Sequence, residues 1–360
     1  MFNIKSLYIN SFRCYEAQNF LFSPGINILY GENGVGKTSI IEAIGYLGIC
    51  NSFRSSKESE VLKKEDKYFF VKGNFCSSEQ ENIEIIVSYD GTKKKISKNG
   101  SVYKKISDYI GYFNVVIFDP SDLYIVKGTP SIRRRFLNLN ISQIDKEYLH
   151  SFSKYNAILN KRNDYLKKNS NIDKIYLDAI TQMLVDEAKI IIKKRQDFIN
   201  FFNDYVYDIA KELSNNSDYI KVEYSPFVNI DEIDKKIKES VEKDIIYKTT
   251  TVGPHKDDIK IYINDSDAAI YGSQGQIRTI AIAFKLALYR YFTQFNDKQI
   301  ILLDDVLSEL DENRQNQLLK ILSNETQIFI TTTNIEGIDK NIIQSSKLMR
   351  IEKGGLKWLI

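Results

Sequence analysis

A segment near the N-terminus carries the residue types and spacing that bind phosphate groups. It reads Gly31-Glu32-Asn33-Gly34-Val35-Gly36-Lys37-Thr38 and fits the pattern G-x-x-x-x-G-K-[ST]. The glycines let successive backbone N–H groups converge on phosphate oxygens. The Lys37 ammonium would reach the outer phosphates, and the Thr38 hydroxyl would bind a magnesium ion. We therefore expect this phosphate-binding loop (residues 31–38) to hold a nucleotide with Mg²⁺.

The loop needs a strand before it and a helix after it, and the sequence supplies both. Residues 26–30 form an apolar run that predicts a buried strand, and residues 38–44 predict the first turns of a helix. A second apolar run, residues 300–303, ends in Asp304 and Asp305. We expect Asp304 to hold Mg²⁺ and Asp305 to orient or deprotonate the attacking water. An aspartate in that second role is compatible with slow hydrolysis.

A third segment could bind an anion at the start of a helix. The signature segment (residues 272–276, Gly-Ser-Gln-Gly-Gln) precedes a stretch rich in Ala, Ile and Leu that predicts a helix to about residue 292. A serine in this place is often only an N-cap, but the flanking glycines open the backbone for a second phosphate contact. Since one nucleotide already fills the phosphate-binding loop, we expect Ser273, Gly275 and Gln276 to meet a nucleotide held by another copy of the chain.

Composition narrows the class of protein. Hydrophobic residues make up 43% and charged residues 27%, a globular mixture, and the formal net charge of +3 favours no particular partner. The three cysteines lack C-x-x-C spacing, which disfavours a disulfide framework and a zinc site and suits the reducing cytoplasm. No apolar stretch reaches the roughly 18 residues that a membrane span requires, so no membrane association is expected.

The pattern of predicted strands and helices divides the chain into three parts. Residues 1–125 and residues 249–360 mix strand and helix patterns and are predicted to be two halves of one α/β domain. Residues 126–248 are predicted to form a helical lobe between them. Two stripes of apolar residues in this lobe, with Arg162 in the first and Arg195 in the second, predict an antiparallel helical hairpin.

The order of these motifs resembles the ABC-type ATPase head of SMC proteins and their relatives. The resemblance depends on four features: the phosphate-binding loop, the signature segment, the strand ending at Asp304, and Ser308-Glu309-Leu310-Asp311. The resemblance implies an α/β head with a mixed sheet flanked by helices, interrupted by the helical lobe. It also implies that Ser273 and Gly275 contact the γ-phosphate of a nucleotide in the second copy, and that residues 308–311 form the D-loop at the interface.

Within that group the chain resembles the RecF family along its whole length. The matching segments are residues 10–15, 118–123, 127–128 with 133–137, 253–258, 272–276 and 304–311. This resemblance implies that Arg13 lies near the nucleotide, and that ATP and Mg²⁺ drive formation of a homodimer. The dimer would clamp DNA at single-strand gaps and release it on slow hydrolysis. It would help RecO and RecR load RecA in recombinational repair and replication restart, and so support the SOS response.

Some positions depart from the wider pattern. Lys256 stands where the family commonly has Arg, which keeps the charge but loses the bidentate fork. Residues 331–333 (Thr-Thr-Thr) stand where ABC transporters place a histidine that senses the γ-phosphate. His255 could contact a phosphate or a second subunit, or it could serve only the turn after Gly253-Pro254.

Other functions account for these motifs less well. The alternative that keeps the ATPase is an SMC-like protein-assembly switch that does not touch DNA. A GTPase fits poorly, because residues 160–163, the closest stretch to N-K-x-D, lack the aspartate. A small-molecule kinase would not need the signature segment. Basic clusters occur at residues 93–95, 104–105, 133–135, 167–168 and 193–195, and each alone is weak evidence for DNA binding.

Overall fold

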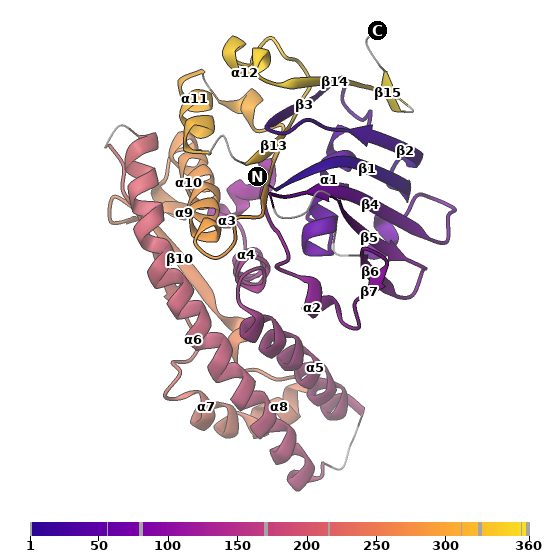
Figure 1. Ribbon diagram of the computed structural model, residues 1–360. Coiled ribbons are helices and arrows are strands. Elements are labelled where there is room, and N and C mark those ends of the chain that lie inside the picture. The colour runs from indigo at the N-terminus through magenta and orange to yellow at the C-terminus, as the bar shows by residue number, and fades with distance from the viewer. Residues whose placement is uncertain are drawn as a thin grey trace. The chain divides into compact units, whose positions relative to one another are not determined.

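The computed structural model describes residues 2–55, 57–78, 82–168, 172–214, 217–310, 312–322, 326–353 and 355–357 (Figure 1). The chain forms two compact units. The first unit combines Met1–Asp122 with Phe284–Ile360, and the second unit is Leu123–Ala283. Both ends of the sequence therefore build one unit, and the middle builds the other. The boundaries proposed from sequence, 125/126 and 248/249, remain a proposal; the second unit continues beyond residue 248 to Ala283.

The first unit contains a six-stranded mixed sheet that carries the phosphate-binding loop. Its order is β15 (Gly355–Lys357), β14 (Lys347–Glu352), β3 (Ile26–Tyr30), β13 (Gln327–Thr332), β12 (Gln299–Asp304) and β8 (Asn114–Phe118). All neighbours pair in parallel except β15, which is antiparallel to β14. Every residue of β8, β12 and β13 is buried, which explains why the centre of each strand is an apolar run without polar alternation. The predicted mixed sheet is confirmed.

A second sheet of the first unit is antiparallel throughout. It runs in the order β2 (Tyr15–Leu21), β1 (Asn3–Phe12), β4 (Phe69–Cys76), β5 (Ile83–Tyr89), β6 (Lys94–Lys98) and β7 (Ser101–Val102). Burial alternates along β4, as expected for a sheet with one face on the core. The short helix α2 (Ile106–Tyr109) follows β7.

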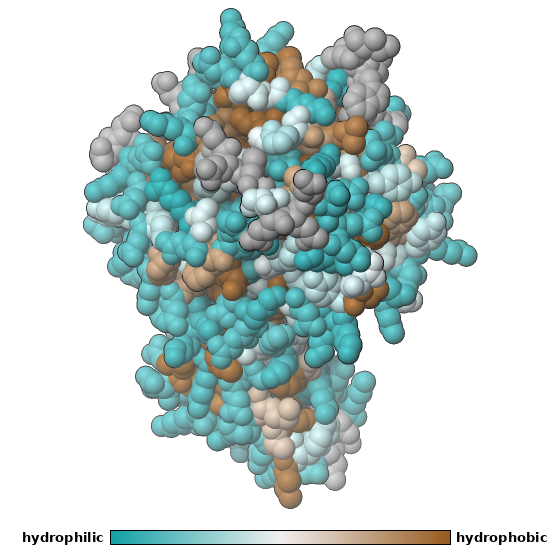
Figure 2. Space-filling model, in the orientation of Figure 1, coloured by the Kyte–Doolittle hydropathy of each residue, from teal (hydrophilic) through white to brown (hydrophobic). Residues whose placement is uncertain are grey.

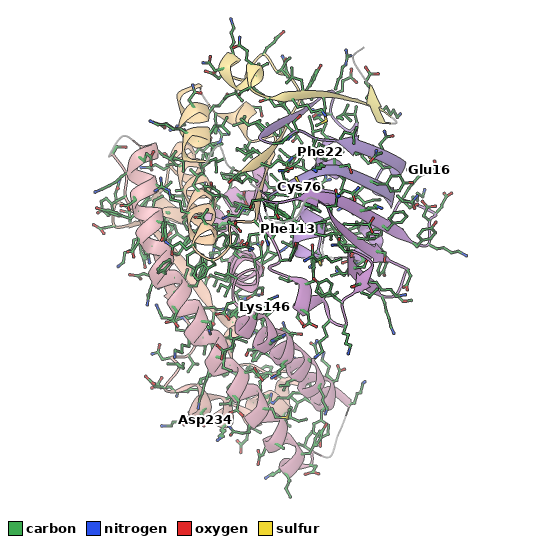
Figure 3. The ribbon with its side chains drawn as sticks, viewed as in Figure 1. Glu16, Phe22, Cys76, Phe113, Lys146 and Asp234 are labelled. Carbon is green, nitrogen blue, oxygen red and sulfur yellow. The ribbon has the colours of Figure 1, made fainter. Side chains whose placement is uncertain are left out.

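Helix α1 (Lys37–Ile49) contacts strands of both sheets and forms the centre of the first unit. All its residues except Thr38 are buried. Gly48 lets the helix approach β8, because a Cβ on this residue would overlap the Val115 side chain. Beside it the rings of Phe2, Phe75 and Phe113 pack with centroids 5.2–5.3 Å apart; Phe113 is labelled in Figure 3. The helix that begins at the phosphate-binding loop is therefore fixed on all sides.

The rest of the first unit lies in the C-terminal half of the chain. It comprises α11 (Glu312–Ile321), α12 (Lys340–Gln344) and the later part of α10 (Gln274–Thr293). The boundary between the two units at Ala283/Phe284 falls inside α10. No helix among the described residues has the length and apolar character needed to cross a membrane.

The second unit is built around two long helices, α5 (Lys146–Lys168) and α6 (Lys174–Leu213), which pack along one another (Figure 1). Arg195 of α6 donates to the Tyr148 hydroxyl near the start of α5, whereas Arg162 near the end of α5 donates to Thr181 near the start of α6. The helices are therefore antiparallel, as the sequence predicts.

Shorter elements complete the second unit. The helices are α3 (Leu123–Lys127), α4 (Pro130–Ser142), α7 (Ile233–Glu239), α8 (Val241–Tyr247) and α9 (Ala268–Tyr271). An antiparallel sheet has the order β11 (Ser266–Asp267), β10 (Asp258–Ile263) and β9 (Ile220–Ser225). Strand β9 packs on α6, and the sheet gives the apolar face of that helix a partner.

Two buried ion pairs stabilise the second unit. Arg162 pairs with Asp244 at 2.8 Å, and neither side chain is exposed. Arg195 pairs with Asp257 at 2.8 Å and is similarly buried. Both arginines lie in the apolar stripes of the hairpin, where a cation is tolerated only with a carboxylate and further hydrogen-bond acceptors. Arg195 also bonds the Pro254 carbonyl, which fixes the segment before β10 against α6.

Candidate nucleotide-binding site

The phosphate-binding loop connects β3 to α1 in a shape that only glycine permits at two positions. Gly31 has φ 150° and Gly36 has φ 110°. A Cβ on Gly31 would overlap the Ile351 carbonyl, and one on Gly36 would lie 2.6 Å from the Tyr15 hydroxyl and 2.8 Å from the Cys14 sulfur. The backbone at Gly31 and Gly36 therefore lies in close contact with Ile351, Tyr15 and Cys14. The loop leads into the N-terminus of the buried helix α1, where the first backbone N–H groups have no partner within the helix and can bind phosphate.

Lys37 is bound by two backbone carbonyl oxygens. Its ammonium donates to the carbonyls of Gly31 and Glu32, at 2.7 Å each, and only 7% of the residue is exposed. Burial lowers the pKa of Lys37, while the carboxylates of Asp305 and Asp304 oppose that shift. A phosphate group beside Lys37 would add negative charge to that of the two carboxylates and would offer the ammonium a charged acceptor in place of the neutral carbonyls.

Asp304, at the end of β12, meets the first turn of α1. Its Oδ1 accepts hydrogen bonds from the hydroxyls of Thr38 at 2.8 Å and Thr331 at 2.7 Å. Burial raises the pKa of the Asp304 carboxyl, and the two hydroxyl donors oppose that shift by stabilising the carboxylate. Among the described residues no group of three His, Cys, Asp or Glu side chains could hold a metal ion. The oxygens of Thr38 and Asp304 fit Mg²⁺ that completes its shell with phosphate and water.

Asp305 adopts a left-handed backbone conformation, with φ 54°. Its N–H donates to the Thr331 hydroxyl at 3.0 Å, and the Ser308 hydroxyl donates to the Asp305 carboxylate at 3.0 Å. These contacts hold the carboxylate at the cavity that Asp304 also lines. Thr331 thus contacts both aspartates. Thr331, near the end of β13, was noted in the sequence, but Asp304 lies 27 residues away and no local pattern indicates the contact.

Arg13 lines the same cavity but is already paired. Its guanidinium makes two bonds to Glu42 of α1, at 2.9 and 2.6 Å, and a third to the Glu60 carbonyl. Arg54 lies 3.6 Å from Glu42, has a side chain that is 46% exposed, and also lines the cavity. The sequence analysis did not select Arg54, since nothing in its neighbourhood marks it as a phosphate ligand.

These side chains surround a single cavity of about 480 Å³ in the first unit. Its lining residues are Arg13, Cys14, Asn33, Gly34, Gly36, Lys37, Thr38, Ser39, Arg54, Glu60, Leu62, Asp304, Asp305 and Thr331. The structure therefore brings together most of the residues predicted from the phosphate-binding loop and from the strand before Asp304. Gly31, Glu32 and Val35 line a second cavity of about 510 Å³.

The signature segment belongs to the second unit. Ser273 accepts a hydrogen bond from the Gln276 N–H at 3.2 Å, and the Gln276 side chain accepts one from the Ser273 N–H at 3.0 Å. This reciprocal pair is a capping box at the start of α10. Ser273, Gly275 and Gln276 do not line the described cavity around Lys37. Their predicted contact with a nucleotide in a second copy remains a prediction, and Asp311 of the predicted D-loop lies outside the described residues.

His255 is bound within the second unit. The Thr250 carbonyl can only accept, so His255 Nε2 carries the proton and donates to it at 3.1 Å, and Nδ1 accepts from the Tyr155 hydroxyl at 2.6 Å. Burial lowers the pKa of His255 to about 4. Both ring nitrogens are therefore engaged in an uncharged ring. Of the two interpretations of His255, this geometry favours the structural turn.

Comparison with known proteins agrees with this geometry. Residues 3–354 match the family model described as the RecF/RecN/SMC N terminal domain. The chain is 37% identical to the DNA replication and repair protein RecF of Halalkalibacterium halodurans, with 99% of both chains covered. It is 36% identical to that of Geobacillus kaustophilus, with 98% of both covered.

Solved structures lead to the same group. Two structures of the recombination mediator protein RecF in the RecFOR pathway, one with ATP and one described as RecF-ATPrS, superpose with TM-scores of 0.90. They are 33% and 32% identical to this chain, covering 100% of it and 98% of their own length. An Smc head domain from Pyrococcus furiosus, 15% identical with a TM-score of 0.56, shares the fold. The full-length match in sequence and structure shows that this chain belongs to the RecF family.

Proposed function

We propose that the chain is a Mg²⁺-dependent ATPase of DNA replication and repair, in which ATP binding joins two copies around DNA and slow hydrolysis separates them. The observation that carries this proposal is the single cavity in which Lys37, Thr38, Asp304 and Asp305 converge. It offers a cation for phosphates, an oxygen pair for Mg²⁺ and a carboxylate for water, which are the parts that phosphoryl transfer to water requires.

On binding, the side chains of the cavity would exchange their present contacts within the protein for contacts with the nucleotide and Mg²⁺. Lys37 would direct its ammonium from the Gly31 and Glu32 carbonyls toward the β- and γ-phosphates. Thr38 and Asp304, now joined at 2.8 Å, would take the cation between them. Bound Mg²⁺ neutralises charge on the phosphates. Arg13, fixed by Glu42, and Arg54, with its exposed side chain, would add positive charge at the edge of the cavity.

Asp305 would act on the attacking water. The hydroxyl of Ser308 and the strained backbone at Asp305 hold its carboxylate toward the cavity. A carboxylate in that place accepts a proton from water or orients the water in line with the γ-phosphate. The Asp305 side chain is shorter than that of a glutamate, so its carboxylate would lie further from the water. This fits slow hydrolysis and a role as a switch.

The signature segment would close the site from a second copy. The start of α10 presents the exposed residues Ser273 and Gly275, and a helix N-terminus of this length attracts phosphate. Two nucleotides would then lie between two copies. The RecFOR pathway in which the similar RecF structures are placed supports RecO and RecR as the proposed protein partners. RecA loading at single-strand gaps and SOS induction complete the proposed role. The cytoplasm is the proposed location.

The structure narrows which basic clusters could hold DNA. Arg133 is bound bidentately to Asp258, Arg134 bonds the Asp257 carbonyl, and Arg195 is buried, so these arginines have structural partners. Exposed lysines remain at positions 93, 95, 104, 105, 167, 168 and 193. The displayed face of α5 and α6 is largely hydrophilic, with a few hydrophobic patches (Figure 2).

Light scattering and gel shifts test this proposal together. The Asp305→Asn variant should form a dimer with ATP and retard gapped DNA, because it binds ATP but hydrolyses it poorly. Lys37→Ala, the control, should bind ATP weakly and stay monomeric. A dimer that leaves DNA unshifted would instead support the protein-assembly switch. If Asp305→Asn stays monomeric at saturating ATP, the ATP-driven clamp is wrong.

A further inference from the structure

The signature segment is held by a carboxylate from a distant part of the second unit. Asp218 Oδ1 accepts hydrogen bonds from Gln276 Nε2 and from Asn264 Nδ2, at 3.0 Å each. Because Nε2 faces this carboxylate, the amide oxygen of Gln276 is turned to the other side, where it accepts from the Ser273 N–H at 3.0 Å. Asp218 and the Ser273 N–H therefore hold the Gln276 amide from its two sides in one orientation.

This arrangement leaves the Ser273 hydroxyl with a proton to donate. A hydroxyl has one donor and two acceptor positions, and the N–H of Gln276 already occupies one acceptor position at 3.2 Å. Among the residues that the structure describes, none accepts the Ser273 proton, and the side chain is exposed. The Ser273 hydroxyl can therefore donate its proton to an oxygen atom of another molecule, such as a phosphate oxygen.

Asp218 is itself anchored at two sides. Its N–H donates to the Ser214 hydroxyl at 3.0 Å, and Ser214 is the C-cap of the long helix α6. On the other side Asn264 lies in the tight turn between β10 and β11, where Asn264 and Asp265 have φ 49° and 62°. Asn264 also accepts from the Tyr219 N–H at 3.0 Å. Asp218 connects the end of α6, this turn and the start of α10.

We propose that Asp218 is the positioning residue of the signature segment: it orients Gln276, and through Gln276 it sets Ser273 for the phosphate held by a second copy. This inference rests on the proposed function, in which Ser273 makes that contact. Asp218 is no catalytic residue, since it does not line the described cavity around Lys37. Its loss should weaken association of two copies and leave nucleotide binding by one copy intact.

The test compares two substitutions at position 218 in the Asp305→Asn background. Asp218→Ala removes the acceptor, so the ATP-driven dimer should weaken by about tenfold or more, the loss expected for a hydrogen bond to a charged group. Asp218→Asn keeps an Oδ1 that can accept from both Gln276 and Asn264, so its dimer should stay close to the parent. Sedimentation at several protein concentrations measures the dimer, and a fluorescent ATP analogue measures binding to the monomer, which should not change. With Asp305 restored, Asp218→Ala should lower kcat and leave KM unchanged.

A second pair of variants keeps the proposal testable if Asp218→Ala unfolds. Gln276→Glu places a carboxylate against Asp218 and should weaken the dimer. Adding Asp218→Asn supplies an amide donor to Glu at 276 and should restore much of it. A parent that fails to dimerise overturns the proposed function. A parent that dimerises while Asp218→Ala dimerises equally well, or an unrescued Gln276→Glu, overturns only the role of Asp218.

Discussion

Cys14 offers a direct chemical test of where the nucleotide binds. It is the exposed cysteine of the chain and lines the cavity, whereas Cys50 is buried and Cys76 is half-buried. Saturating ATP should therefore slow alkylation of Cys14 by N-ethylmaleimide several-fold, as measured by mass spectrometry. The protection should be lost in Lys37→Ala, and Cys14→Ser should show no fast alkylation. Equal rates with and without ATP would mean that the nucleotide lies elsewhere.

His255 predicts how stability depends on pH. Its pKa falls from 6.5 to about 4 on folding, so the unfolded chain binds a proton that the folded chain does not between these values. The stabilisation is full above pH 6.5 and is lost as the pH falls toward 4. At pH 5 the loss from this residue should reach at most about 2 kcal/mol.

Urea unfolding at pH 7.5 and pH 5 measures that loss. The His255→Gln variant is the control, because its amide oxygen can still accept from the Tyr155 hydroxyl but has no proton to take up. The wild type should lose more free energy of unfolding than the variant between the two pH values. Identical losses would show that His255 does not titrate as its burial implies.

At the scale of elements, the ion pair between α6 and the segment before β10 should contribute strongly to stability. Replacing Asp257 by Ala leaves the buried Arg195 cation without its carboxylate, which should cost about 3–5 kcal/mol in free energy of unfolding. Glu239→Ala is the matched control, since its partner Lys235 is 75% exposed and such pairs contribute little. Urea denaturation compares the two; similar losses would contradict the role given to Asp257.

Elements with local signals could be predicted, and long-range partners could not. The strand, loop and helix around Lys37 follow from neighbouring residues, as does the apolar strand before Asp304. The periodicity that placed Arg162 and Arg195 in apolar stripes gave no indication of their carboxylates, which lie 82 and 62 residues further along the chain. Arg54 at the cavity was missed for the same reason: its position depends on a contact with Glu42 that only the folded chain makes.

At the scale of the whole molecule, exposed lysines should set the salt dependence of DNA binding. Each lysine that contacts a phosphate releases counterions, so its loss reduces the slope of log affinity against log salt by about 1. We expect the combined change of Lys104, Lys105, Lys167 and Lys168 to Ala to reduce this slope. All four are exposed.

The control for that experiment removes lysines that already have a partner. Lys235 and Lys236 both lie within 4 Å of Glu239, at 3.8 and 3.3 Å, so their replacement by Ala should leave the slope nearly unchanged. Fluorescence anisotropy with gapped DNA between low and moderate salt gives the slopes. A fourfold lysine variant that keeps the full slope would place the DNA contacts on other surfaces.

The hydrogen bonds from Lys37 to two backbone carbonyls affect how fast a nucleotide can bind. Because Gly31 and Glu32 hold the ammonium when no phosphate is present, the loop keeps its shape after product departs. The ammonium must leave these two carbonyls before it can meet the phosphates, so nucleotide binding should be slower than diffusional encounter and should depend on temperature more steeply than solvent viscosity does. Stopped-flow mixing with a fluorescent nucleotide would separate this step from the association and dissociation of two copies.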